Sequence, residues 1–467
     1  MGTRLSMLHR PALPLLLRAR AYRPRGFHPA GALAYPGFRW FALAQFISFT
    51  LLTVQMMVRG WQMQELTGSP FMVSLVGAVA VLPMLIFGFF GGELADRFPR
   101  KRVVIWGELG TLAGYGSLAV PAALDILQPW HILASTAVLG TTMALSGPSR
   151  QALIVDLVAE RNQRRAIGAY MIVIHLTVLV GPAIGTPLLT GIGIKGALLI
   201  STFAFIPAIP LYLLVNPLKV QKRTQPKGPV VLNLAAGVRY IAREPSLRWM
   251  FVALIVMVLF VNTWGGLFPT LAEDVLHRGA GGLGGISIAV GIGALTGAVL
   301  AMVMAGKVRD ARQQFAGALL FAGFVAVLAM SEWYPLSLVA TAAAAASGAP
   351  FFISNMAATQ LNSAEEFRGR VVSVRYVVSA VQPLGLIALG ATAEAIGPRW
   401  ALAGSAAIGG VLMLVIALTM ARRDLLAGRV AAKDPPAVPV DGEAPEPVLG
   451  PGAQSARPQP PTAATTD

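Results

Sequence analysis

Residues 91–102 read Gly91-Gly92-Glu93-Leu94-Ala95-Asp96-Arg97-Phe98-Pro99-Arg100-Lys101-Arg102, and they lie between two long apolar runs. Paired glycines allow helices to pack closely, and Pro99 favours a turn after a helix end. Asp96 stands directly before a cluster of four basic residues. It is placed to form an ion pair at this face of the protein, or to accept hydrogen bonds from the N-terminus of a neighbouring helix.

The composition around this loop excludes a water-soluble globule. Of the 467 residues, 55% are hydrophobic and only 12% are charged, and the mean hydropathy is +0.66. Soluble domains carry about 25% charged residues. The chain has no cysteine, which excludes disulfides, thiol nucleophiles and cysteine zinc sites.

The apolar runs are long enough to cross a membrane, which takes about 20 residues of helix. Backbone groups cannot stay unpaired in lipid, so runs of this kind must be helices. The sequence therefore predicts an all-α membrane protein with twelve transmembrane helices. They are expected at 40–62, 71–94, 103–124, 130–157, 166–190, 196–215, 249–271, 283–306, 314–331, 335–360, 371–395 and 400–420.

The basic residues predict how these helices are oriented. An even number of spans places both tails on one side, and Lys and Arg gather on the cytoplasmic side. All but four of the 37 basic residues fall on the side of the tails, the exceptions being Arg59, Lys195, Arg278 and Arg399. We therefore expect both termini in the cytoplasm, with the protein in a bacterial inner membrane. The dispersal of the charge through loops argues against nucleic-acid binding.

The same pattern divides the chain into five segments. They are a basic N-terminal tail (1–37), a six-helix bundle (38–215), a cytoplasmic linker (216–247), a second six-helix bundle (248–421) and a disordered tail (422–467). Within the linker, Leu232–Arg243 predicts an amphipathic helix that lies on the membrane surface through Leu234, Val238 and Ile241.

The N-terminal tail allows more than one interpretation. It is rich in arginine and poor in acids, as organellar presequences are, and Met1–Ser6 fits a myristoylation pattern. We favour a basic cytoplasmic tail or an over-extended start.

Residues 91–102 resemble the signature loop of the major facilitator superfamily, whose usual form is Gly-x-Leu-Ala-Asp-Arg-x-Gly-Arg-Lys/Arg. The matching residues are Gly92, Leu94, Ala95, Asp96, Arg97, Arg100 and Lys101. Pro99 replaces the usual glycine, which changes the turn but keeps the charges. The resemblance implies two pseudo-symmetric six-helix bundles around a central pathway that opens alternately to the two sides.

Other stretches are similar to the macrolide-efflux and enterobactin-exporter-like branch of drug:proton antiporters. They are Trp61-Gln62, Leu66–Pro70, Gly147–Ala152, Asp156–Val158 and Arg368–Ser373. Resemblance to this branch implies that the protein exports a small molecule in exchange for protons.

The resemblance also implies a conformational latch between the bundles, formed by Gly92, Asp96, Arg97, Arg100 and Lys101. Asp156 could pair with Arg97 or Arg100, and Arg375 belongs to the facing half. Another match is Gly181-Pro182 with Gly185, which resembles an antiporter motif, although close helix packing explains these residues equally well.

Ionisable residues inside predicted spans are functional candidates. His175 lies near the middle of its span and could carry a proton, or could be a packed histidine. Glu108 and Arg150 lie at similar depths and could form an ion pair. Arg59 is expected to reach the outer surface with its long side chain. Proton coupling would rest on His175, Glu108 or Asp96.

Helices one, four, seven and ten should line the pathway if the resemblance holds, and they contain no acid near mid-span. This favours neutral, amphipathic or anionic solutes. The polar or cationic candidates in or near the pathway are Gln55, Arg59, Thr142, Ser146, Asn262, Trp264, Asn355 and Thr359.

No catalytic, cofactor or metal-binding motif stands out. A nucleophile elbow with its triad, a zinc-protease HExxH and a Walker A loop are all missing from the sequence. We predict a monomeric secondary transporter that exports a small amphipathic molecule such as a drug or siderophore. A lipid or lysolipid flippase, an importer on the same fold, and a non-transporting membrane scaffold are the alternatives.

Overall fold

The computed structural model describes residues 31–218, 230–304 and 310–433, and these contain helices and no strand. The elements are η2 (Gly31–Ala34), α1 (Pro36–Thr67), α2 (Pro70–Arg97), α3 (Arg100–Ala123), α4 (Pro129–Asp156), η3 (Glu160–Asn162), α5 (Gln163–Phe205), α6 (Ala208–Leu213), α7 (Val230–Arg243), α8 (Pro245–Val256), η4 (Met257–Val261), η5 (Trp264–Leu267), α9 (Phe268–Thr270), η6 (Leu271–Val275), α10 (Gly279–Met304), α11 (Asp310–Met330), α12 (Tyr334–Leu361), η7 (Glu365–Phe367), α13 (Arg368–Ser379), α14 (Gln382–Ile396) and α15 (Pro398–Lys433).

Local sequence sets where the helices begin and end. Proline starts α1, α2 and α4, because its fixed φ suits the first helical position and its missing N–H has no partner there. Gly68 ends α1 at φ 59°, a left-handed conformation that glycine adopts readily. The turn into α2 is closed by Ser69, whose hydroxyl accepts a hydrogen bond from the Met72 N–H at 3.2 Å.

Ten helical segments among the described residues are long and apolar enough to cross a membrane. One of these segments, Glu160–Leu213, contains the predicted span 166–190 and most of the predicted span 196–215. It bends at Gly193, where φ is 70°. The predicted span 130–157 corresponds to α4, which is a helix of 28 residues but is not among the ten.

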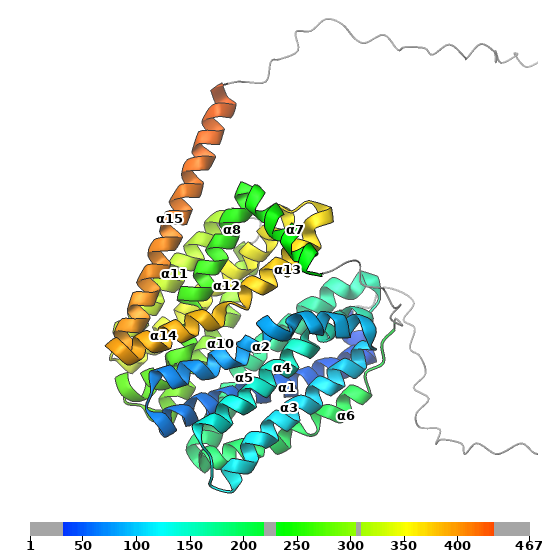
Figure 1. The fold of residues 1–467 in the computed structure, drawn as a ribbon, viewed down its shortest axis with the longest axis vertical. Coiled ribbons are helices and arrows are strands. Elements are labelled where there is room, and N and C mark those ends of the chain that lie inside the picture. The colour runs from blue at the N-terminus through cyan, green and yellow to red at the C-terminus, as the bar shows by residue number, and fades with distance from the viewer. Residues whose placement is uncertain (1–30, 219–229, 305–309, 434–467) are drawn as a thin grey trace, which may run out of the picture. The chain divides into compact units, whose positions relative to one another are not determined.

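The helices form two groups (Figure 1). α1 to α6 lie together in one group, and α7, α8 and α11 to α14 lie in the other. α2 packs against α14 and α5 packs against α10, so these two helix pairs join the groups. We call the group of α1–α6 the first half and the group of α7–α14 with residues 398–420 the second half.

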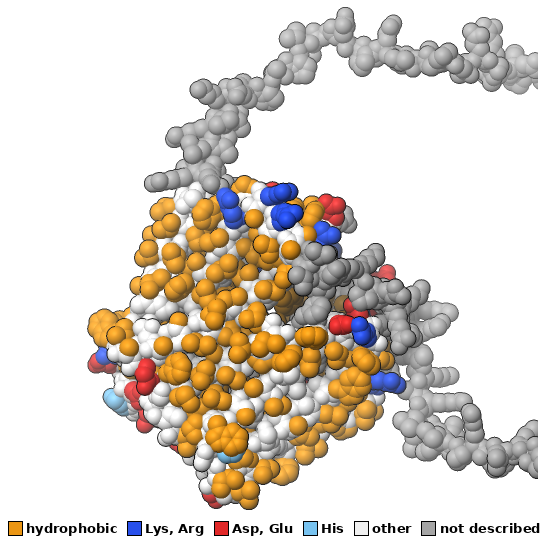
Figure 2. Space-filling model, viewed as in Figure 1, with side chains coloured by type: hydrophobic (Ala, Val, Ile, Leu, Met, Phe, Trp, Pro, Cys, Tyr) orange, Lys and Arg blue, Asp and Glu red, His pale blue; other side chains and the backbone are white. Residues whose placement is uncertain are grey.

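The two ends of the helices differ in charge. We call the end with Arg97–Arg102, residues 161–165 and α7 the basic end, and the end where α1 meets α2 the opposite end. Hydrophobic side chains cover most of the visible surface between them (Figure 2). Large apolar side chains such as Ile172, Met302 and Val339 are exposed, as expected for a protein surface in contact with lipid.

α7 lies in the linker, at the residues where the amphipathic helix is expected. Ile241 is only 6% exposed and packs with residues of α8 and α13, and Leu234 packs against the same cluster, whereas Val238 is 51% exposed. Gly237 allows the close approach, because a Cβ there would lie 3.0 Å from the Arg370 carbonyl oxygen. The apolar face of α7 therefore packs largely on the protein.

The predicted tails lie mostly outside the described residues. Residues 1–30 and 434–467 are not described, so the presequence, myristoylation and disorder hypotheses for them stay predictions. α15 runs to Lys433, which means that helix continues into the start of the tail predicted to be disordered.

Candidate functional site

A buried ion pair lies inside the first half. The Arg150 Nη2 atom of α4 is 2.7 Å from the Glu108 Oε1 atom of α3, and the two side chains are 3% and 0% exposed. The sequence predicts this pair from the similar depths of the two residues. Its surroundings are closed to solvent, which strengthens the attraction between the charges.

Glycines along α3 make the pair possible. A Cβ at Gly107 would lie 2.4 Å from the Ser146 Cβ, one at Gly110 would lie 2.4 Å from the Thr142 Cγ2, and one at Gly114 would lie 2.8 Å from a Leu139 methyl. Without side chains at these positions α3 approaches α4 closely. Glu108, next to Gly107, then comes within reach of the Arg150 side chain.

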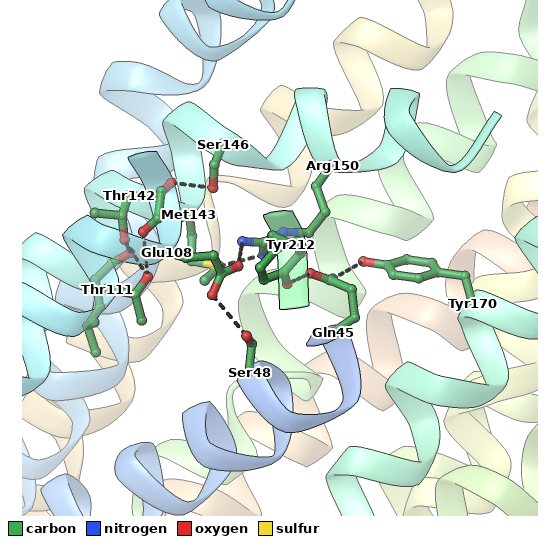
Figure 3. Close-up of polar contacts among 12 residues, drawn as sticks. Gln45, Ser48, Glu108, Thr111, Thr142, Met143, Ser146, Arg150, Tyr170 and Tyr212 are labelled. Atoms are coloured by element: carbon green, nitrogen blue, oxygen red, sulfur yellow. Dashed lines mark hydrogen bonds and ion pairs between the residues drawn. The ribbon is translucent and has the colours of Figure 1, made fainter. Parts of the chain in front are cut away.

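Polar side chains from three other segments complete the site (Figure 3). The Ser48 hydroxyl of α1 donates to the second Glu108 oxygen at 2.9 Å. Gln45, one turn earlier on α1, donates through Nε2 to the Tyr170 hydroxyl at 3.2 Å and accepts from the Tyr212 hydroxyl. The Arg150 guanidinium lies 5.2 Å from the centre of the Phe49 ring. The pair is thus held by α1, α3 and α4 and flanked by tyrosines of α5 and α6.

Sequence reasoning missed Gln45, Ser48, Tyr170 and Tyr212. A signal for the first two was available, because polar residues recur on α1 at positions 45, 48, 55, 59 and 62. These spacings of three, four and seven residues place them on one helical face. That face is buried, since all five residues are buried.

Three basic residues of the signature loop, Arg97, Arg100 and Lys101, contact residues of the first half. Arg97 pairs with Glu93 one turn before it. Arg100 pairs with Asp156 at 2.7 Å and joins α3 to α4. Of the two partners predicted for Asp156, Arg97 and Arg100, it is therefore Arg100 that forms the ion pair. Lys101 donates to the Leu213 carbonyl oxygen of α6 at 2.8 Å. At Gly92 an added Cβ would meet nothing within 4 Å.

Arg375 contacts its own half. Its guanidinium donates to the Asn355 side-chain oxygen and to the Phe352 carbonyl oxygen of α12. A neighbouring side chain on α13 reaches the other half: the Tyr376 hydroxyl donates to the Gln151 side-chain oxygen of α4 at 3.0 Å.

The eight pathway candidates lie at two levels of burial. Thr142 and Asn262 are half-buried, and the others are buried in the helix cores: Gln55, Arg59, Ser146, Trp264, Asn355 and Thr359. Asn355 donates to the Met250 carbonyl oxygen of α8 at 3.0 Å, and Trp264 packs edge-on against two phenylalanine rings. In this conformation Gln55, Arg59, Trp264 and Asn355 join neighbouring helices, whereas the hydroxyls of Ser146 and Thr359 donate to carbonyl oxygens of their own helix.

The sequence predicts that the Arg59 side chain reaches the outer surface, and this prediction is wrong. It is 0% exposed, because Gln55, Gly114 and Tyr115 surround its guanidinium. The extended side chain therefore turns into the first half and not along the helix toward water.

Two candidates on α5 also have clear positions. His175 is half-buried, and no hydrogen bond to it is found among the described residues. Gly181 and Gly185 face α1, where added Cβ atoms would lie 1.7 Å from the Thr53 hydroxyl oxygen and 2.9 Å from the Met57 methyl. The glycines, together with Pro182 between them, lie at a tight contact between α1 and α5.

Several contacts join the halves at the opposite end. The Ser69 hydroxyl donates to Glu394 Oε2 of α14 at 2.8 Å. The Gln64 side chain donates to Asp274 Oδ1 at 3.3 Å and accepts from the Thr270 hydroxyl at 2.8 Å. Sequence reasoning missed these contacts, which depend on the spatial meeting of segments about 200 to 325 residues apart in the chain.

Comparisons with known proteins agree with this arrangement. A protein-family model described as "Transmembrane secretion effector" matches residues 28–442. The multidrug efflux pump Tap of Mycobacterium tuberculosis (strain ATCC 25618 / H37Rv) is 28% identical over 354 residues, which cover 72% of this chain and 82% of the pump. The enterobactin exporter EntS of Escherichia coli O6:K15:H31 is 28% identical over 285 residues, covering 59% of this chain and 65% of the exporter.

Solved structures share the fold. A POT family transporter superposes with a TM-score of 0.68 at 12% identity, covering 83% of this chain and 96% of the transporter. A bacterial homolog of the human lysosomal transporter Spinster, in an inward-facing and unoccupied conformation, gives a TM-score of 0.64 at 15% identity, covering 83% and 98%. At these identities the likeness concerns the fold alone, and it confirms an all-helical transporter architecture.

Proposed function

This chain belongs to the transmembrane secretion effector family of the major facilitator superfamily, and from that premise we propose that it exports a small amphipathic molecule, such as a drug or siderophore, in exchange for protons. The chain is a multi-pass membrane transporter and not an enzyme, as the family and the relatives indicate. Efflux of drugs and siderophores is what the relatives' names state of those proteins. The absence of acids from the middle of the predicted pathway helices supports an amphipathic, neutral or anionic substrate.

The proposed topology has twelve spans in two bundles, residues 38–215 and 248–421. α4 supplies one span, and the Gly193 bend divides Glu160–Leu213 into two. This count places both termini on the side of the basic end, which the positive-inside rule assigns to the cytoplasm. The apolar flanks are then in contact with the lipid of a bacterial inner membrane, and the protein acts as a monomer.

We infer that the described conformation opens toward the basic end. The halves are joined at the opposite end by Glu394 with Ser69 and by Gln64 with Asp274. Their ribbons diverge toward the basic end (Figure 1), where the Tyr376 side chain still reaches Gln151 of the first half. In alternating access these contacts break when the basic end closes.

Helix register supports the proposed latch at the basic end. Gly77 lies against Leu386, and Gly390 lies against Ser74, which fixes α2 and α14 as antiparallel neighbours. Continued through the break before α14, this register places Gly92 opposite Val372 of α13. Closing the basic end would bring the signature loop onto the first turns of α13, where Gly92 leaves room for the contact. Arg97, Arg100 and Lys101 would hold the loop in shape.

The observation that carries the proton coupling is the buried Glu108–Arg150 pair. A proton on Glu108 would remove the negative charge that compensates Arg150. The protonated and ionised states of Glu108 would therefore favour different positions of α3 and α4. Ser48 links Glu108 to α1, a predicted pathway helix. Coupled changes of this kind let a proton bias a two-state equilibrium. His175 is the second candidate, since it lies half-buried on α5.

Transport in inverted membrane vesicles tests the proposal. With an imposed pH gradient and a panel of dyes, macrolides and siderophores, we expect gradient-dependent accumulation of at least one compound. Asp96→Asn should lose this accumulation, because the substitution weakens the proposed latch. In the double variant Glu108→Gln/Arg150→Met, which leaves no unpaired charge, transport should no longer depend on the pH gradient. Glu332→Gln is the control, because Glu332 pairs with Arg399 at the opposite end within one half.

The outcomes separate the alternatives. Loss of gradient dependence in His175→Asn, with the double variant unaffected, would move the coupling to His175. No accumulation of any panel compound by folded protein would contradict drug and siderophore export and favour a lipid substrate or a scaffold role.

A further inference from the structure

Arg59 is a buried charge without an opposite charge. Its Nη1 donates to the Gln55 side-chain oxygen at 2.7 Å, and its Nη2 lies 3.4 Å from the Gly114 carbonyl oxygen. The Tyr115 ring centre lies 5.5 Å from the guanidinium carbon. These neighbours are polar or aromatic, and none carries a negative charge.

Arg59 differs from the other buried charged residues in having no described partner of opposite charge. Four charged side chains are buried among those the structure describes: Arg59, Glu108, Arg150 and Asp156. Glu108 pairs with Arg150 and Asp156 pairs with Arg100, whereas no carboxylate pairs with Arg59 within the described part of the chain. An uncompensated charge in a dry interior is strongly unfavourable.

The hydrogen-bond balance points the same way. The Arg59 Nε and the Tyr115 hydroxyl are both buried and contact no acceptor of the protein. Gln55 uses its oxygen for Arg59 and its Nε2 for Ser201 at 2.8 Å, and the Ser201 hydroxyl itself donates to the Ala197 carbonyl oxygen at 2.6 Å. The cluster therefore has an excess of donors as well as one excess positive charge. Those are the properties of an anion site.

We propose that the Arg59 guanidinium and the Tyr115 hydroxyl, whose buried Nε and hydroxyl groups have no hydrogen-bond partner among the described residues, bind one chloride-sized monovalent anion inside the first half. One excess charge calls for one negative charge. Size is limited by close packing, since a Cβ at Gly114 would already lie 2.8 Å from a Leu139 methyl and the Tyr115 and Phe205 rings are 5.0 Å apart. The anion ties α1 to α3, and the Gln55–Ser201 hydrogen bond ties α1 to the part of α5 beyond Gly193. The proposal is independent of what the protein exports.

Thermal unfolding of the purified protein in detergent tests this site. Chloride replaces gluconate at constant ionic strength, and the unfolding midpoint is recorded at each concentration. A ligand that binds only the folded state raises its stability as the logarithm of its concentration. We expect the wild-type midpoint to rise by a few degrees with chloride, bromide to act similarly, and acetate and sulfate to have little effect.

Variants locate the response. Arg59→Gln should unfold at an equal or higher temperature than wild type in gluconate, because it removes the uncompensated charge, and should not respond to chloride. Tyr115→Phe should weaken the apparent chloride affinity by about fivefold, the value of one hydrogen bond. The matched control is Arg399→Gln, which neutralises an arginine paired with Glu332 near the surface and should keep the full response.

Three results would overturn the proposal. They are a wild-type midpoint that chloride does not change, a chloride response that persists in Arg59→Gln, and a response to acetate larger than that to chloride. The measurement on the wild type does not depend on whether a variant folds. A larger response to acetate would assign the site to a carboxylate.

Discussion

Glu394 of α14 caps the first turn of α2 from the other half of the molecule. Its Oε2 accepts hydrogen bonds from the Ser69 hydroxyl at 2.8 Å and from the Phe71 backbone N–H at 3.3 Å. The N-terminus of a helix favours a negative charge, so the carboxylate stabilises the meeting of α2 and α14. Since the two helices belong to different halves, we expect the contact to break when the opposite end opens.

We expect Glu394→Ala to open this end more often. Loss of the cap costs about 1 kcal/mol, which corresponds to a several-fold larger open population. The chain has no cysteine, so Thr186→Cys, on the face of α5 that meets Gly284 of α10, can report accessibility. A membrane-impermeant maleimide added to intact cells should label it several-fold faster in Glu394→Ala. Equal labelling in Glu394→Ala and in the control Glu332→Ala would contradict a gating role.

The Glu108–Arg150 pair should show strong coupling between its members. Removing one partner leaves the other charge buried and unpaired, which costs about 3–5 kcal/mol. We expect Glu108→Gln and Arg150→Met each to lower the unfolding midpoint of the purified protein more than the double variant does. Additive losses in the double variant would mean that the two side chains act separately.

The positions of the helices and the Glu108–Arg150 contact could be predicted from the sequence. Hydropathy reports which stretches of the chain cross the membrane, and depth along a helix follows from residue count at about 1.5 Å per residue. Two residues of opposite charge at equal depth in successive spans can therefore be paired before the structure is known.

The rest depended on how each helix is rotated and on what it meets. Arg59 could reach water or turn inward, and only the positions of Tyr115 and Gly114 on α3 decide between them. Asp156 could pair with Arg97 or Arg100, and the helix start at Arg100 brings that residue to α4. Such choices are set by tertiary packing, which neither hydropathy nor motif spacing records.

Close packing of α3 on α4 gives a matched pair of substitutions. Gly107→Ala would place a methyl group 2.4 Å from the Ser146 Cβ, whereas Gly116→Ala on the same helix would meet nothing within 4 Å. Overpacking costs about 1–3 kcal/mol, while alanine in an open helix position gains up to about 1 kcal/mol. We expect a lower unfolding midpoint for Gly107→Ala and an equal or higher one for Gly116→Ala. Equal midpoints would argue against the tight α3–α4 seam.

The register between α2 and α14 predicts which residues meet when the basic end closes. Tyr376 points toward the first half, because its hydroxyl contacts Gln151, and Val372 lies one turn earlier on the same face of α13. A disulfide requires Cα atoms within about 7 Å. We therefore expect the pair Gly92→Cys and Val372→Cys to cross-link under oxidation, and a substrate or pH gradient that favours the closed basic end to increase the yield.

The matched control places the second cysteine at position 377 and not at 372. Val377 lies on the same helix but on another face. Gly92→Cys with Val377→Cys should not cross-link. If the two pairs react equally, the register does not continue from α14 through the break into α13, and the signature loop does not close on the first turns of that helix. A second disulfide, between Ser69→Cys and Glu394→Cys, would hold the opposite end closed. If only the Val372 pair reacts, and its yield falls when this second disulfide is formed first, the two ends cannot be closed at once. That exclusion is the property that alternating access requires of this fold.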